Sequence, residues 1–217
     1  MYRAALRNDW NTTITDIFKK DPDNIPLYLT TRISDNHDMA LHIAVAADSA
    51  VFVQELVNKM EKKDLAMQNR DGCTPFFIAA ASGRVELVKP MFGKNTELPS
   101  IHGHEGKLPI HIAAKGGHKE MVTYLYGVTK DKLTEDDLIK LAPDLIARAD
   151  LFDVALNLLN EYPSLATVNL HYRTPMMFWS NMVEETTLDI LARTPMMSRD
   201  SAYQIQQGIL KRCFNLC

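Results

Sequence analysis

The stretch 108–126 ("LPIHIAAKGGHKEMVTYLY") has a pattern of apolar and polar positions that predicts two short helices joined by a tight turn. Pro109 suits the first turn of a helix, because the N–H that proline lacks would have no partner there. The pair Gly116-Gly117 ends this helix, since glycine readily adopts the left-handed conformation of a helix end. A second, amphipathic helix then follows, with an apolar stripe of Met121, Val122 and Leu125.

The same two-helix pattern occurs three times. The units start at Met39, Thr74 and Leu108, which are 35 and 34 residues apart, and read "MALHIAVAADSAVFVQELV", "TPFFIAAASGRVELVKPMF" and "LPIHIAAKGGHKEMVTYLY". Neither helix of a unit can bury its apolar face alone, so stacked neighbours must supply the core. The repeat therefore predicts an all-α solenoid.

This period and the opening motif resemble the ankyrin repeat, whose units are about 33 residues long and open with T-P-L-H-x-A. The resemblance implies helix-turn-helix repeats joined by hairpin fingers, with degenerate capping repeats at both ends. We expect a single array over 1–217. Its predicted segments are a degenerate N-terminal cap repeat (1–34), three core repeats (35–70, 71–104 and 105–134), a degenerate repeat (135–168), and an irregular insertion, last degenerate repeat and C-terminal capping helix (169–217).

Two regions depart from the regular pattern near the ends. A further period after Leu108 leads to Ala142, where the apolar spacing persists without most of the motif. The polar stretch 19–38, with its prolines, predicts an irregular connection. A terminal helix is predicted by the one-sided spacing of Ile205, Ile209, Leu210, Cys213 and Phe214.

Composition and charge narrow the function classes. The formal net charge is −3, which does not favour the basic surface that nucleic-acid binding needs. The start "MYRAALRNDW" lacks the apolar core of a signal peptide, and no stretch has the roughly 18 apolar residues needed to span a bilayer. Three cysteines without framework spacing favour reduced thiols. We therefore expect a cytoplasmic chain that neither binds nucleic acid nor inserts into a membrane.

Several segments resemble, more narrowly, the ankyrin half of plant ankyrin-transmembrane proteins of the accelerated-cell-death and salt-tolerance type. They are "YRAALRNDW", "LVNKMEKKDLAMQNRDGCTPFFIAAASGRVELVK", "HKEMVTYLY" and "DLFDVALNLLNEYPSLAT". In that family membrane helices with a Pro-Gly-Gly motif follow the array, whereas this chain ends before any such segment. The resemblance implies the cytosolic recognition part of a defence or stress regulator, and leaves open whether a membrane domain follows in a longer protein.

The ankyrin resemblance also implies where a partner, another protein or peptide, binds. In such arrays the variable positions lie around the finger turn and at the exposed end of the first helix. Carried over by position, they are Asp35, Asn36, Asp38, Arg70, Asp71, Cys73, Ser82, His104, Glu105, Lys107 and Lys115. The strip carries mixed charge, so we expect a polypeptide partner with its own charge pattern.

The histidines of "IHGHEGKLPIHIAAKGGH" raise a metal hypothesis, because imidazole is the commonest metal ligand. His111, like His42, occupies the histidine position of the motif, and His118 begins a second helix. These positions have structural roles in ankyrin repeats. His102 and His104 fall on a finger, where a metal-ion or small-ligand sensor remains the alternative function.

No sequence motif for catalysis or for a cofactor is present: there is no G-x-S-x-G, P-loop, H-E-x-x-H or dinucleotide fingerprint. We therefore predict a chain that is not an enzyme and has no cofactor. Four residues depart from the repeat motif. His37 stands in a glycine position, Leu108 replaces the motif threonine, and Phe77 replaces the motif histidine. Pro90 should kink or end its helix.

Overall fold

A computed structural model describes residues 1–166, 169–172 and 183–186 of the chain. It divides into two compact units, Met1–Lys132 and Leu133–Cys217, which are described separately. The described residues are mainly helical, and the first unit is a solenoid of repeated helix pairs, as the sequence predicts. The predicted terminal helix lies outside the described residues, as does most of the predicted segment 169–217.

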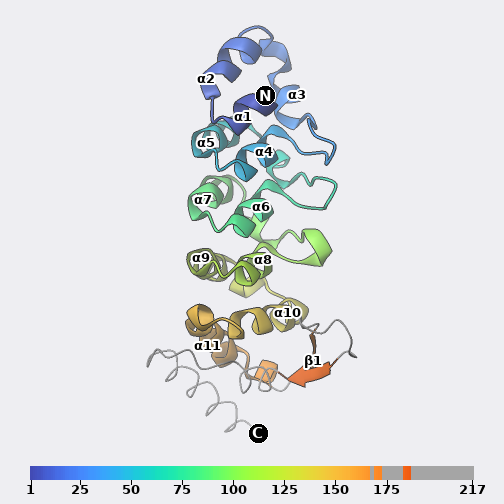
Figure 1. Cartoon of the computed structure of the whole chain (residues 1–217), viewed down its shortest axis with the longest axis vertical. Coiled ribbons are helices and arrows are strands. Elements are labelled where there is room, and N and C mark those ends of the chain that lie inside the picture. The colour runs from blue at the N-terminus through green and yellow to red at the C-terminus, as the bar shows by residue number, and fades with distance from the viewer. Residues whose placement is uncertain (167–168, 173–182, 187–217) are drawn as a thin grey trace. The chain divides into compact units, whose positions relative to one another are not determined.

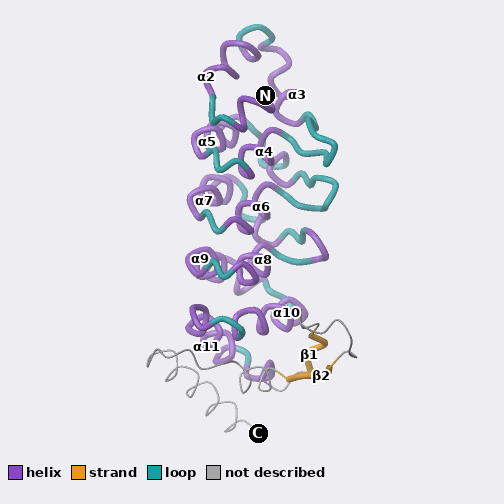
Figure 2. The backbone as a smooth tube through the Cα atoms, in the orientation of Figure 1, coloured by secondary structure: helices purple, strands orange, loops and turns teal. Residues whose placement is uncertain are grey.

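The first unit is a stack of helix pairs (Figures 1 and 2). The inner helices of the three regular repeats form one column and the outer helices form a second. The inner helices are α4 (Ala40–Ala46), α6 (Pro75–Ser82) and α8 (Pro109–Gly116). The outer helices are α5 (Ala50–Lys59), α7 (Val85–Lys94) and α9 (Lys119–Thr129).

Short 3-10 turns connect the repeats of this unit. They are η3 (Asp64–Ala66), η4 (Leu98–Ser100), η5 (His104–Gly106) and η6 (Lys130–Lys132). Small side chains line the contacts between inner helices: Ala44, Ala79 and Ala113 have no exposed surface. Because alanine lets neighbouring helices approach closely, these residues allow the inner column to stack.

The N-terminal repeat also contains a helix pair, built from α1 (Tyr2–Leu6), α2 (Trp10–Thr13) and the π-helical segment η1 (Ile14–Phe18). The following polar stretch is more ordered than the sequence predicts, since it contains the turn η2 (Pro22–Asn24) and helix α3 (Ile25–Thr30). Asp21 explains this order, because it accepts hydrogen bonds from Asn24 (3.0 Å) and from the Tyr28 hydroxyl (2.6 Å).

Pro90 does not end its helix, which was one of the two outcomes expected from the sequence. Helix α7 continues to Lys94, whose ammonium group donates a hydrogen bond to the carbonyl of Val57 at 2.7 Å. The carbonyl that residue 90 would otherwise bond belongs to Glu86, which is exposed, so water can satisfy it. Met91, buried directly after the proline, keeps the helix packed on the core.

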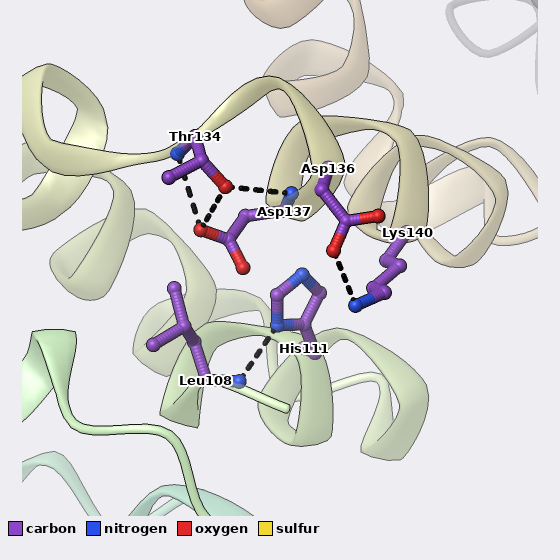
Figure 3. Close-up of polar contacts among 6 residues, drawn as sticks. All are labelled: Leu108, His111, Thr134, Asp136, Asp137 and Lys140. Atoms are coloured by element: carbon purple, nitrogen blue, oxygen red, sulfur yellow. Dashed lines mark hydrogen bonds and ion pairs between the residues drawn. The ribbon is translucent and has the colours of Figure 1, made fainter. Parts of the chain in front are cut away.

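The second unit contains α10 (Glu135–Ile146), η7 (Ala149–Leu151), α11 (Phe152–Glu161) and η8 (Pro163–Ala166). Helix α10 begins with a capping box, in which Thr134 and Asp137 bond each other's backbone N–H at 3.1 and 3.2 Å (Figure 3). Ala142 therefore lies inside a helix rather than at the start of a unit. Two short antiparallel strands also occur, β1 (Asn169–Tyr172) and β2 (Val183–Thr186), with Asn169 opposite Thr186.

Candidate partner-binding surface

Three fingers project from the same side of the first unit, each just before an inner helix (Figure 2). Each finger is closed by a backbone hydrogen bond to the carbonyl of the residue just before Met39, Thr74 or Leu108, and the donor of the first finger lies one residue earlier than in the other two. The N–H groups of Ile33, Asn69 and Gly103 donate to the carbonyls of Asp38, Cys73 and Lys107, at 2.7, 3.0 and 2.8 Å. The repeat period therefore places three similar hairpins in a row along the first unit.

His37 adopts the left-handed backbone conformation of the glycine it replaces. Its φ is 59°, against 77° for Gly72 and 65° for Gly106 at the equivalent positions. Histidine tolerates a positive φ better than most residues do. The His37 N–H also donates to the Ser34 carbonyl at 3.0 Å, which holds the turn. The first finger therefore keeps the turn of the others without a glycine.

The structure places all eleven predicted partner-binding residues on the first unit, and none of them is buried. Seven are exposed: Asp35, Arg70, Asp71, Ser82, His104, Glu105 and Lys115. Four are half-buried: Asn36, Asp38, Cys73 and Lys107. Their role in binding stays a prediction.

A groove of about 220 Å³ joins the first two fingers to helices α4 and α6. Four predicted residues line it together: Asn36, Asp38, Asp71 and Cys73. The others on the strip, including Arg70, Lys107 and Lys115, lie outside its lining. The groove therefore contains only those predicted residues that lie on the first two fingers.

Residues of the inner helices complete this groove, and the sequence-based strip missed them. They are His42, Ile43, Ala46 and Ile78, together with Asn69 of the second finger. A signal for them existed in the repeat, because isoleucine recurs at 43, 78 and 112, the same position of each unit. An apolar residue that recurs at an incompletely buried position of an inner helix marks the floor of such a groove.

Two asparagines fix the carboxylates of the groove. The Asn69 amide donates to Asp38 at 2.8 Å, while its oxygen accepts the N–H groups of Asp71 and Cys73 at 3.1 and 2.9 Å. The Asn36 amide donates to Asp71 at 2.9 Å. The first two fingers are also linked through the backbone, because the Arg70 N–H donates to the Asn36 carbonyl at 2.9 Å. The groove wall is therefore preorganised.

The third finger carries a separate charge pair. The ammonium group of Lys107 lies 2.6 Å from the Glu105 carboxylate and lowers the pKa of that carboxyl group. His104 lies on the same finger, with its Nε2 3.8 Å from Glu105. Within the described ranges, no group of three or more His, Cys, Asp or Glu side chains could hold a metal ion. The metal-sensor alternative at His102 and His104 therefore has no support in this part of the chain.

The three histidines with predicted structural roles, His42, His111 and His118, contact backbone groups of the repeats. His42 Nδ1 accepts the Met39 N–H at 3.2 Å, so its Nε2 carries the proton and donates to the Cys73 carbonyl of the next finger at 3.1 Å. His111 Nδ1 accepts the Leu108 N–H at 2.9 Å (Figure 3). His118 lies 3.0 Å from the Ala81 carbonyl of the preceding repeat through its Nε2.

Burial lowers the pKa of His42 below its usual 6.5, because desolvation penalises the imidazolium. The neutral form is therefore favoured in the folded state. As pH falls, the unfolded chain takes up the proton before the folded chain does. The contribution of His42 to the unfolding free energy is therefore complete above about pH 6.5. Below that pH it falls by at most about 1.4 kcal/mol per pH unit.

The substitution His42→Leu tests this linkage, because leucine does not titrate and lacks the ring for which Gly103 leaves room beside Phe77. We expect a loss of about 1–3 kcal/mol at neutral pH, since two buried backbone groups lose their partner. We also expect a shallower dependence of the unfolding free energy on pH between 7.5 and 5.5, measured by urea denaturation. A variant with the slope of the unaltered chain would show that His42 does not titrate on unfolding.

The comparisons with known proteins agree with this geometry. The family described as "Ankyrin repeats (3 copies)" matches residues 3–100, and "Ankyrin repeat" matches residues 105–133. No curated protein matches the chain in sequence.

Solved structures with a similar fold include three ankyrin-repeat proteins. EF0377, an ankyrin repeat protein, is 18% identical with a TM-score of 0.65, covering 97% of this chain and 95% of its own. An ankyrin repeat domain from Acinetobacter baumannii AYE is 16% identical with a TM-score of 0.64, covering 98% and 96%. The human ASB11 ankyrin repeat domain is 17% identical with a TM-score of 0.51, covering 96% of each chain.

Ankyrin repeats mediate protein binding and are typically non-enzymatic scaffolds. In the part of the chain that the structure describes, no helix is both long and apolar enough to cross a membrane. The repeat period, the stacked helix pairs, the three equivalent fingers and the two family matches lead to one assignment: the chain belongs to the ankyrin-repeat family.

Proposed function

We propose that the chain is a non-enzymatic module that binds another polypeptide along the fingers and inner helices of its first unit. The observation that carries this proposal is the groove in which finger side chains and the apolar floor of α4 and α6 meet. A partner there would bury Ile43 and Ile78 while its polar groups face Asp38 and Asp71. Apolar contact supplies affinity, and the charges supply orientation and specificity.

The groove suits part of a polypeptide better than a small-molecule cofactor. Its volume of about 220 Å³ is below the roughly 300 Å³ at which small-molecule sites usually begin. A peptide that occupies it could also reach the exposed side chains of Arg70 and Lys115, which lie outside its lining. The proposed binding surface is therefore the groove together with the charged strip.

Reversing three cations of the strip should weaken partner binding. The variant carries Arg70→Glu, Lys107→Glu and Lys115→Glu, and we expect at least a tenfold loss of captured partner, because opposed like charges cost several kcal/mol at an interface. Quantitative mass spectrometry of proteins labelled by a proximity-labelling fusion measures the loss.

A matched control keeps the same change in net charge away from the fingers. It carries Lys19→Glu, Lys59→Glu and Lys62→Glu, all at exposed positions. We expect the control to keep the partners of the unaltered chain. Equal partner lists for the unaltered chain and the finger variant would refute the proposed surface.

The resemblance to plant ankyrin-transmembrane proteins supports a finer proposal, that the module acts at the cytosolic face of a membrane in defence or stress signalling. The same experiment in plant cells tests it. Partners that depend on the finger cations should then include membrane or signalling proteins of these responses. Dependent partners of unrelated function would overturn this finer role and leave the binding module intact.

A further inference from the structure

The two carboxylates of the groove have only neutral partners among the described residues. Asp38 is bonded by Asn69 and by the Ser34 hydroxyl, at 2.8 and 2.7 Å, and Asp71 is bonded by Asn36. No lysine or arginine of the described ranges forms an ion pair with either. Arg32, a cation of the first finger, instead donates to the Gln68 carbonyl at 3.3 Å. The groove therefore presents two carboxylates that hydrogen-bond only neutral groups of the described residues.

The apolar floor lies in the same groove. Ile43 is 9% exposed, Ile78 is half-buried, and Ala46 is exposed beside them on the lining. Both carboxylates act on the half-buried Cys73 thiol, whose pKa is raised by burial and further by Asp71 and Asp38. Charge and apolar surface thus meet within about 220 Å³. This combination fits a side chain with an apolar stem and a cationic head.

We propose, building on the function proposed above, that the groove receives a lysine or arginine side chain of the bound polypeptide. The alkyl stem packs against Ile43, Ala46 and Ile78, and the cationic head lies between Asp38 and Asp71. Arginine is preferred, because its planar fork of N–H donors can serve two carboxylates at once. The asparagine amides hold both carboxylates in place before the partner arrives, which lowers the entropic cost of binding.

Peptide titration followed by NMR tests the occupant directly. The probe is an alanine-glycine heptapeptide with one central arginine, added to the ¹⁵N-labelled full chain. We expect shifts at the amides of Gly72, Cys73 and Ile78, and at least a tenfold weaker Kd for the same peptide carrying citrulline, which keeps the shape of arginine without its charge. Equal affinity for the two peptides would overturn the proposal.

Removing the two charges should abolish this discrimination. In the variant Asp38→Asn/Asp71→Asn the amides can still accept the hydrogen bonds from Asn69 and Asn36, so we expect the fold to persist by circular dichroism. The arginine peptide should then bind no better than the citrulline peptide. The control Asp23→Asn/Asp131→Asn removes two exposed carboxylates that do not line the groove, and should retain the preference.

The outcome is separable from that of the proposed function. If the finger-cation variant loses its partners but Asp38→Asn/Asp71→Asn keeps them, the binding module stands and the cationic occupant is overturned. If both variants keep every partner, both proposals fail. Loss of partners in the aspartate variant, together with loss of the arginine preference, supports the occupant.

Discussion

Replacing Phe52 with alanine is expected to destabilise the start of the array by about 3–5 kcal/mol, the usual loss for a large buried aromatic residue. Phe52 has no exposed surface, and its ring packs edge-to-face on Trp10 with centroids 5.1 Å apart. Trp10 packs in the same way on Phe18, at 5.6 Å. The substitution therefore opens a cavity where the N-terminal repeat meets the next one.

The loss should be local, because each solenoid repeat contacts only its neighbours. We expect hydrogen exchange to accelerate in peptides from α1, α2 and α5, while α8 and α9 keep their protection. The conservative change Phe52→Leu should lower the unfolding free energy much less than Phe52→Ala does. The control Phe92→Ala removes a half-buried ring that packs on Tyr124 at 6.1 Å and should cost clearly less than Phe52→Ala. Uniform loss of protection along the first unit would contradict the nearest-neighbour description.

The fold was predictable because the same helix-forming pattern occurs several times along the chain. Each core unit carries its own apolar spacing, and glycine ends the first helix at 83 and 117, both with positive φ. Helix order and finger placement follow from that period. The start of α10 at Glu135 could not be read in this way, because there the capping box of Thr134 and Asp137 sets the boundary rather than the repeat motif.

The groove was less predictable, because it depends on side-chain pairs that no motif records. Asn69 bonds Asp38 across 31 residues of sequence, and only the stacked fingers bring the two together. Phe77 gives a second example. Its ring occupies the space beside Gly103, where an added Cβ would lie 2.6 Å from it. Phenylalanine at the motif histidine position therefore goes together with a glycine in the next finger, which leaves room for the ring. Neither residue alone indicates this pairing.

Replacing Gly83 with alanine is expected to destabilise the first unit by about 3 kcal/mol, from two separate causes. Gly83 ends α6 with a φ of 71°, which alanine adopts only with strain. An added Cβ would also lie 2.5 Å from the His118 ring. The ring cannot shift freely, because its Nε2 lies 3.0 Å from the Ala81 carbonyl and an added Cβ at Gly116 would also meet it, at 2.6 Å.

Gly93 supplies the matched control, since it is the same residue type in the neighbouring helix. It lies in α7 without a positive φ, and nothing lies within 4 Å of an added Cβ. Gly93→Ala should therefore stabilise the chain by about 0.5–1 kcal/mol, through helix propensity and a less flexible unfolded state. Urea denaturation of both variants measures the difference. Adding His118→Ala to Gly83→Ala should recover only the part of the lost stability that comes from the clash with the His118 ring, because the backbone strain remains. Equal effects of the two glycine substitutions would show that neither the left-handed turn nor the His118 contact holds the repeats together.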